Sequence, residues 1–156
     1  MYRIMVISDT HHRLEHITKV LDNIQQFDMI IHLGDNVADA KNLERLYPDK
    51  EVVAVQGNTD MPTPYASVEI FREIEGVSIL MTHGHLYGVK TGTDRIFYRG
   101  KELGAKAVLF GHTHIPLCVK EEEIYLLNPG GHNYPERSIG IIEIEDGRVR
   151  CCLYPC

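Results

Sequence analysis

The sequence predicts an α/β fold with β-sheets in its middle and helices outside, and three observations support this. In the first third, short apolar runs alternate with stretches whose apolar residues recur at helical spacing, which is typical of parallel strands joined by helices. In the last third, apolar runs follow one another across turns, which indicates antiparallel strands. The length of 156 residues suits one ordinary domain, so we expect a single domain over residues 1–156.

The N-terminal elements follow the order strand, helix, strand, helix, strand. Leu14, Ile17 and Leu21 recur on one face of the first helix, and Pro48 stops the second. Short links between these elements favour a parallel sheet with helices packed on its face. The strands are expected at residues 2–8, 29–33 and 52–55, and the helices at about 13–26 and 39–47.

In the later part of the chain, strands and helices no longer alternate regularly. Two apolar runs around a turn at Glu75-Gly76 predict a hairpin over residues 68–81, so antiparallel pairing joins the sheet. A helix over about 93–103 ends at Gly104, which suits the position just past a helix end. Further strands are expected at residues 107–110, 115–120, 124–127 and 138–145, with one more after the Asp146-Gly147 turn.

Composition and charge exclude several classes of partner. The net charge of -6 argues against duplex nucleic acid and anionic membranes, which bind clustered Lys and Arg. No apolar run approaches ~18 residues, so we expect no membrane span. The polar Ser8-Asp9 comes too early for a secretory signal. The cysteines lack zinc-binding spacing and are read as reduced thiols of a cytoplasmic protein: Cys118, Cys151, Cys152 and Cys156.

Metal-type side chains follow five predicted strands at the point where each strand ends. In open α/β sheets ligands bind at the carboxyl ends of strands, because the loops there converge. Each residue alone has an ordinary explanation, such as turn chemistry for Asp35 behind Gly34. Their recurrence at the same end of successive strands is the main evidence for one shared site. The residues are Asp9 and His11, Asp35, Asn58, His83, and His112 with His114.

This residue set indicates the chemistry of a two-metal site. It contains carboxylates, an amide and imidazoles but no cysteine, which suits borderline divalent ions such as Mn, Fe, Ni or Zn. Seven ligands are too many for one tetrahedral ion and suit two ions that share a carboxylate. In extended backbone His112 and His114 would point the same way. Gly111 would let the backbone approach the cluster.

The motifs occur in a fixed order along the chain. They are Asp9-Thr10-His11, Gly34-Asp35, Gly57-Asn58-Thr59-Asp60, His83 and Gly111-His112-Thr113-His114, with Asn128-Pro129-Gly130 further on. This series resembles that of the calcineurin-like metallophosphoesterases, and the short chain is similar to their small, YfcE-type phosphodiesterase branch. The resemblance covers nearly the whole chain, and only the full ordered series is specific.

The resemblance implies both a fold and a set of roles. The fold would be a four-layer αββα sandwich, with two mixed β-sheets flanked by helices. One ion would be held by Asp9, His11 and His114. The second would be held by Asn58, His83 and His112, and Asp35 would bridge both. The candidate catalytic residues are therefore Asp35, Asn58 and Asp60.

The implied activity is hydrolysis of a small phosphodiester by a hydroxide that bridges two divalent ions. Mn is the expected metal, with Ni, Zn and Fe as alternatives. Thr59 stands where many family members have a histidine that is taken to assist the leaving group. Because Thr cannot act as a general acid near neutral pH, we expect diesters to be preferred over alkyl monoesters. Gly131, where the family often has Ser, weakens any inference about phosphate contacts there.

Several residue roles and functions stay open at this stage. Asp60 could orient a ligand imidazole or be a turn carboxylate. Asn36 and His85 are candidate substrate-binding residues, although Asn36 could be a turn residue and His85 could replace His83 as the ligand. Three further histidines are read as loop or structural residues, namely His12, His16 and His32. Two later residues could reach the site, namely His132 and Arg137.

Two other functions compete with the phosphodiesterase. The first is a non-catalytic scaffold, as in the retromer subunit of this fold, where a ligand histidine is replaced. Every motif ligand is present here, which favours catalysis. The second is a phosphomonoesterase, which the short chain and Thr59 disfavour. The oligomeric state is also open, and a homo-oligomer could form through an exposed C-terminal edge with Val149, Leu153 and Tyr154.

Overall fold

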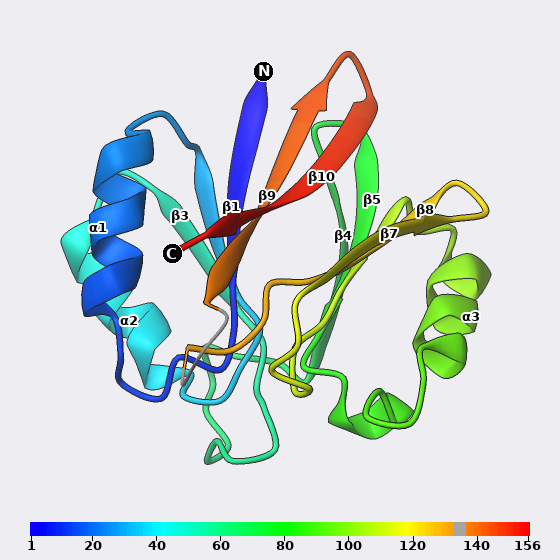
Figure 1. The fold of residues 1–156 in the computed structure, drawn as a ribbon, viewed down its shortest axis with the longest axis horizontal. Helices are drawn as coiled ribbons and strands as arrows, with labels where there is room; N and C mark the ends of the chain where they lie inside the picture. Colours follow the sequence, from blue (N-terminus) through cyan, green and yellow to red (C-terminus); the bar gives the residue numbers. More distant parts are fainter. Residues whose placement is uncertain (133–136) are drawn as a thin grey trace.

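Two five-stranded sheets stack face to face and form the middle of the molecule (Figure 1). The computed structural model describes residues 1–132 and 137–156. Helices α1 (Glu15–Ile24) and α2 (Ala38–Leu46) cover the outer face of one sheet, and α3 (Asp94–Leu103) covers the other. The predicted four-layer αββα sandwich with two mixed sheets is therefore confirmed.

The first sheet has the strand order β10-β9-β1-β2-β3. Its first three strands in the chain run parallel, as the alternation of apolar runs and helices predicts, and β9 pairs antiparallel with β1. The hairpin of β9 and β10 closes this sheet on one side. The bounds are β1 Tyr2–Ile7, β2 Met29–His32, β3 Glu51–Ala54, β9 Ser138–Glu145 and β10 Arg148–Pro155.

The second sheet has the strand order β4-β5-β6-β8-β7. Its β4–β5 pair is the predicted hairpin, whereas β5, β6 and β8 run parallel. A short 3-10 helix, η1 (His85–Tyr87), follows β5. The bounds are β4 Glu69–Ile74, β5 Val77–Thr82, β6 Ala107–Leu109, β7 Leu117–Glu121 and β8 Ile124–Asn128.

Alternating side chains of the strands divide the core into layers. Ile4, Val6 and Ile31 of the first sheet face the second sheet and pack with Ile79 and Leu109. Their neighbours along the strands turn outward to the helices, as period-two alternation requires. Burial of all these side chains holds the strands in register, because a shift by one residue would expose them.

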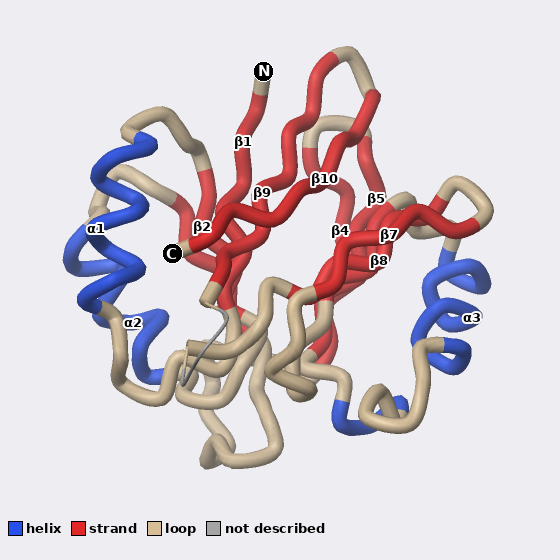
Figure 2. The backbone as a smooth tube through the Cα atoms, in the orientation of Figure 1, coloured by secondary structure: helices blue, strands red, loops and turns tan. Residues whose placement is uncertain are grey.

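The predicted element bounds differ from the structure in a few places. The first helix begins at Glu15 and ends before Gln25, whose φ of +58° leaves the helical region. The strand expected over residues 115–120 begins at Leu117, because Pro116 has no N–H for a ladder. Figure 2 shows the long loops gathered at one end of the sandwich, which is the carboxyl end of the parallel strands.

Candidate metal centre

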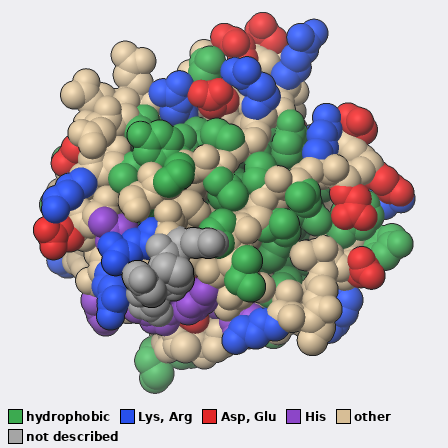
Figure 3. Space-filling model, in the orientation of Figure 1, with side chains coloured by type: hydrophobic (Ala, Val, Ile, Leu, Met, Phe, Trp, Pro, Cys, Tyr) green, Lys and Arg blue, Asp and Glu red, His purple; other side chains and the backbone are tan. Residues whose placement is uncertain are grey.

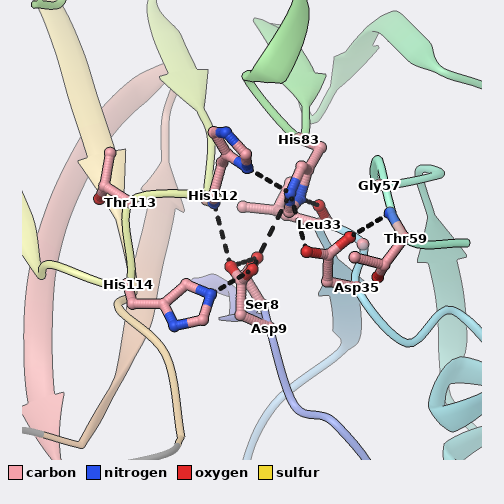
Figure 4. Close-up of polar contacts among 12 residues, drawn as sticks. Ser8, Asp9, Leu33, Asp35, Gly57, Thr59, His83, His112, Thr113 and His114 are labelled. Carbon is pink, nitrogen blue, oxygen red and sulfur yellow. Dashed lines mark hydrogen bonds and ion pairs between the residues drawn. The ribbon is translucent and has the colours of Figure 1, made fainter. Parts of the chain in front are cut away.

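Six of the seven residues predicted as ligands lie together at the loop end of the two sheets. They form two groups in which ligand-type atoms lie within 4.8 Å of one another, and Asp35 belongs to both. Figure 4 shows Asp9, Asp35, His83, His112 and His114 pointing toward one another. The first group follows β1, β2 and β6, and the second follows β2, β5 and β6. The groups are Asp9, His11, Asp35 and His114, and Asp35, His83 and His112.

The first group contains two buried polar atoms without a hydrogen-bond partner. Asp9 is fully buried, and its Oδ2 accepts hydrogen bonds from the Ser8 hydroxyl and the His112 N–H. Its Oδ1 accepts none from the described residues, although His114 Nε2 lies 3.1 Å away. His11 Nε2 is also buried without a partner in the described part of the chain. Such orphaned atoms are costly, so they fit a cation that would satisfy both.

The second group is organised by the tautomer of His83. Its Nδ1 donates a hydrogen bond to the Leu33 carbonyl at 2.7 Å, which turns Nε2 toward the cluster. Nε2 lies 3.4 Å from Asp35 Oδ2 and 3.2 Å from His112 Nδ1. Two ligands at roughly 2.1 Å from one ion are roughly 3.0–3.4 Å apart at tetrahedral or right angles. The observed spacing therefore fits a shared ion.

Asp35 is held as a carboxylate. Burial acts to raise its pKa, but contact with the His83 imidazole and the N–H of Thr59 outweighs burial and lowers the pKa. Burial likewise opposes a charge on His83, yet Asp35 and Asp9 raise the pKa of that imidazole. Positive charge is therefore favoured at the point where the two acidic side chains face each other.

The backbone is strained at five of the clustered residues. Asp9, His11, Asp35, His112 and His114 all have φ between +45° and +69°. Residues with a Cβ rarely adopt this region, and such strain gathers at functional sites. The expectation that His112 and His114 share an extended backbone is wrong. Because both are left-handed, their side chains diverge, one toward His83 and the other toward Asp9.

Glycines let the backbone approach the cluster closely. A Cβ on Gly111 would lie 2.0 Å from the Ser8 hydroxyl and 2.7 Å from Asp9 Oδ2. A Cβ on Gly57 would lie 2.2 Å from Asp35 Oδ1. Neither position has room for a larger residue, so the glycines of these two motifs are required by close packing at the site.

The remaining predicted site residues surround the two groups. Asn58 has an exposed side chain and forms no hydrogen bond to the described residues, although the next N–H, of Thr59, reaches Asp35. Asn36 Nδ2 lies 2.7 Å from His12 Nδ1. The His85 ring lies 5.5 Å from that of His83, and its Nδ1 is buried without a partner among the described residues.

Asp60 binds backbone rather than an imidazole. Its carboxylate accepts hydrogen bonds from the N–H groups of Asp35, Val37 and Gly57, at 2.9, 2.8 and 2.8 Å. In the described chain no imidazole donates to it. Asp60 therefore ties the loop after β2 to the loop after β3, and it acts on the cluster through the position of Asp35.

A buried polar network lies beside the centre, and the sequence analysis did not predict it. Thr10, between two of the clustered residues, contacts His32 at 2.9 Å and donates to the buried carboxylate of Asp39. Asp39 also accepts the N–H of His12. Asp39 could not be assigned to this network from the sequence, because an acidic residue in the first turn of a helix is ordinarily explained by the helix dipole.

The fold and the site together define an α/β sandwich with a candidate metal centre built from carboxylates and imidazoles at its strand ends. The chain belongs to the calcineurin-like phosphoesterase superfamily, whose family model matches residues 2–147. This assignment confirms the family and the small phosphodiesterase branch that the motif series predicts. The two groups of ligand-type side chains agree with the divalent metals that the family implies.

Curated relatives match over most of their length. A probable metallophosphoesterase of Bacillus subtilis, YsnB, is 32% identical over 97% of this chain and 89% of its own. The phosphodiesterase YfcE of Escherichia coli is 28% identical over 87% of this chain and 82% of its own.

Solved structures share the architecture. A predicted phosphoesterase from Streptococcus pneumoniae superposes with a TM-score of 0.78 at 26% identity, covering 99% and 89% of the two chains. Vps29 from Entamoeba histolytica, solved with Zn2+, superposes with a TM-score of 0.78 at 21% identity over 98% of both chains. The second likeness shows the fold alone. Among the described residues, no helix has the length and apolar character that a membrane crossing requires.

Proposed function

We propose that this protein is a dimetal-dependent phosphodiesterase that acts on a small phosphodiester. The observation that carries the proposal is the position of Asp35, whose carboxylate belongs to both groups of ligand-type atoms. In this proposal Asp9, His11 and His114 would hold one ion, and His83 and His112 would hold the other with Asn58. Asp35 would be a ligand shared by both ions.

Two ions held there would supply an activated water and would neutralise charge on the phosphoryl oxygens. The chain itself supplies orientation. His83 is fixed by its hydrogen bond to Leu33, and Asp35 by the N–H of Thr59 and by Asp60. Asn58 reaches the second ion only if its side chain turns inward from the exposed position. Asn36 and His85 flank the centre and are proposed to contact the substrate.

Thr59 supports diesters over alkyl monoesters. Thr59 is exposed next to Asn58, and its N–H donates a hydrogen bond to Asp35. The only polar group of its side chain is a hydroxyl, which is therefore the only group that it could offer to a leaving group. A hydroxyl is too weak an acid to protonate a poor leaving group near neutral pH. The substrate must then carry a leaving group that departs without protonation, as an aryl or activated diester does.

The relatives support the same reaction class. The phosphodiesterase YfcE is 28% identical over 87% of this chain, which supports hydrolysis of phosphodiesters as the reaction class. The scaffold alternative has support from the fold of the Vps29 structures, but the two groups of clustered ligand-type side chains favour catalysis. We further propose that Mn is the working metal, with Ni, Zn and Fe able to replace it, that one domain spans the chain, and that the protein works in the cytoplasm.

The test uses chelator-treated protein with Mn, Ni, Zn or Fe(II) restored, on bis(p-nitrophenyl) phosphate and on alkyl phosphomonoesters. We expect metal-dependent hydrolysis of the diester and much slower hydrolysis of the monoesters. Faster monoester hydrolysis with several metals would overturn the diester assignment. Absence of hydrolysis with every metal would favour the scaffold.

A further inference from the structure

A cleft of about 320 Å3 opens between the start of α1 and two described residues further along the chain, His132 and Arg137. Arg13 and His16 line it on the α1 side, and His132 and Arg137 line it on the other side. In Figure 3, basic and histidine side chains lie side by side on the lower left of the molecule. The mechanism proposed above assigns no role to these residues.

The cleft and the metal centre share two segments of backbone. His12, which lines the cleft, directly follows His11 of the first group. On the other side, Gly131 precedes His132 and packs against the ring of His114, where a Cβ would lie 2.9 Å from Cγ. The cleft therefore lies next to the metal centre on both of these segments.

The cleft is positively charged in a chain whose net charge is -6. Burial lowers the pKa of His16, and the nearby guanidinium groups of Arg137 and Arg13 lower it further. Within the described residues neither arginine forms an ion pair. Glu15 also lines the cleft, but Lys19 Nζ lies 3.1 Å from its carboxylate. With respect to the described side chains, the two guanidinium groups are thus available to an anion.

The inner wall of the cleft is fixed and uncharged. His16 Nε2 lies 2.8 Å from His132 Nδ1, and His132 is fully buried. Burial lowers the pKa of His132 to about 3, so this imidazole stays neutral. Its Nε2 is buried without a partner among the described residues. This arrangement leaves the two arginines as the positively charged groups that select the ligand.

We infer that this cleft is a second anion subsite, which binds a phosphate monoester group carried by the substrate at a distance from the scissile phosphorus. The inference rests on the proposed function and narrows its substrate class to diesters with an additional phosphate. Planar guanidinium groups match phosphate oxygens in paired hydrogen bonds, which lysine cannot reproduce.

The first experiment compares two synthetic diesters with one leaving group. These are the p-nitrophenyl ester of thymidine 5′-phosphate and the same compound with a 3′-phosphate. With the Mn-loaded full chain, we expect kcat/KM to favour the second compound by about tenfold. Arg13→Gln and Arg137→Gln should each reduce that preference while leaving kcat/KM for the first compound unchanged.

Lys90→Gln is the matched control. Lys90 is exposed and lies outside the cleft, yet its charge affects His112 and His114. This variant should keep the preference, because it removes a positive charge near the metals but not from the cleft. No preference in the wild-type protein, or a preference kept by both arginine variants, would overturn the subsite.

A second measurement separates this inference from the proposed function. Binding of inorganic phosphate to the metal-free full chain is followed by 31P NMR line width, which needs no turnover. We expect binding that weakens about tenfold in the double variant Arg13→Gln/Arg137→Gln. If neither diester is hydrolysed but phosphate binding depends on the arginines, the proposed phosphodiesterase function is contradicted and the anion subsite is supported. Equal phosphate binding by the wild-type protein and the double variant would overturn the subsite.

Discussion

His83 and Asp35 lie 3.4 Å apart across the two sheets, His83 Nε2 facing Asp35 Oδ2. Asp35 follows β2 of the first sheet, and His83 follows β5 of the second. Both side chains are buried. The pair therefore joins the halves of the sandwich at the centre, and any ion bound there would bind both sheets at once.

The same pair shows why a cation is favoured at this point. Although burial opposes a charge on His83, contact with Asp35 and Asp9 raises the pKa of its imidazole. A proton on His83 and a divalent ion thus compensate the same carboxylates. Metal binding should displace the proton, because an imidazole must be neutral to act as a ligand.

Asp35→Asn should remove most of the diesterase activity, by about 100-fold or more, because the amide cannot bridge two ions as a carboxylate does. Metal analysis of the purified variant should show lower occupancy of both sites. Asp49→Asn, an exposed aspartate beside Lys50, is the control and should behave as wild type. Two ions still bound tightly by the Asp35 variant would refute the bridging role.

Gly111→Ala should impair metal binding, because the new Cβ would lie 2.0 Å from the Ser8 hydroxyl and 2.7 Å from Asp9 Oδ2. We expect metal affinity to fall by about tenfold or more, measured by calorimetric titration. Gly76→Ala in the β4–β5 turn is the control. Its φ of +79° makes alanine costly by about 1 kcal/mol, but nothing lies within 4 Å of the new Cβ. Equal metal affinities of the two variants would contradict this account.

Asp60→Ala should destabilise the protein and weaken metal binding together. The change leaves the N–H groups of Asp35, Val37 and Gly57 without their acceptor, at a cost of about 2–4 kcal/mol in the free energy of unfolding. Asp60→Asn keeps one acceptor oxygen and should fall between alanine and wild type. Urea unfolding with and without metal measures both effects. A loss of stability without any change in metal affinity would show that Asp60 does not position Asp35.

Stability should fall as the pH is lowered from about 6.5 toward 4. Burial lowers the pKa of His32 from 6.5 to about 4, so the unfolded chain takes up this proton before the folded protein does. The contribution of His32 is present above pH 6.5 and is lost by about 3 kcal/mol across that window. Urea unfolding of the metal-free protein should show a shallower pH slope for His32→Gln than for wild type. Identical slopes would exclude His32 as the source.

The strand ends and the clustered residues were predictable because each depends on local sequence. Asp9, Asp35 and His83 follow apolar runs that only a buried strand explains, and parallel strands bring their carboxyl ends together. The ordered series of motifs predicted the family, and the match of the family model to residues 2–147 confirms it. The hairpin at Glu75-Gly76 was predictable for the same local reason.

Other features were not predictable, because they depend on contacts between distant segments. The left-handed backbone of His112 and His114 results from packing around Asp9, about a hundred residues earlier. The carboxylate of Asp39 meets Thr10 only after α2 packs beside the first loop. The cleft likewise needs the start of α1 to lie near His132 and Arg137, which no periodicity in the sequence reveals.

The most direct test of the central claim is a Mn2+ titration of the metal-free protein, with bound metal and bis(p-nitrophenyl) phosphate hydrolysis followed in the same samples. We predict that binding saturates at two ions per chain, and that hydrolysis rises with the second ion because Asp35 must bridge both. Saturation at one ion with full activity, or binding of two ions without any hydrolysis, would contradict the dimetal phosphodiesterase.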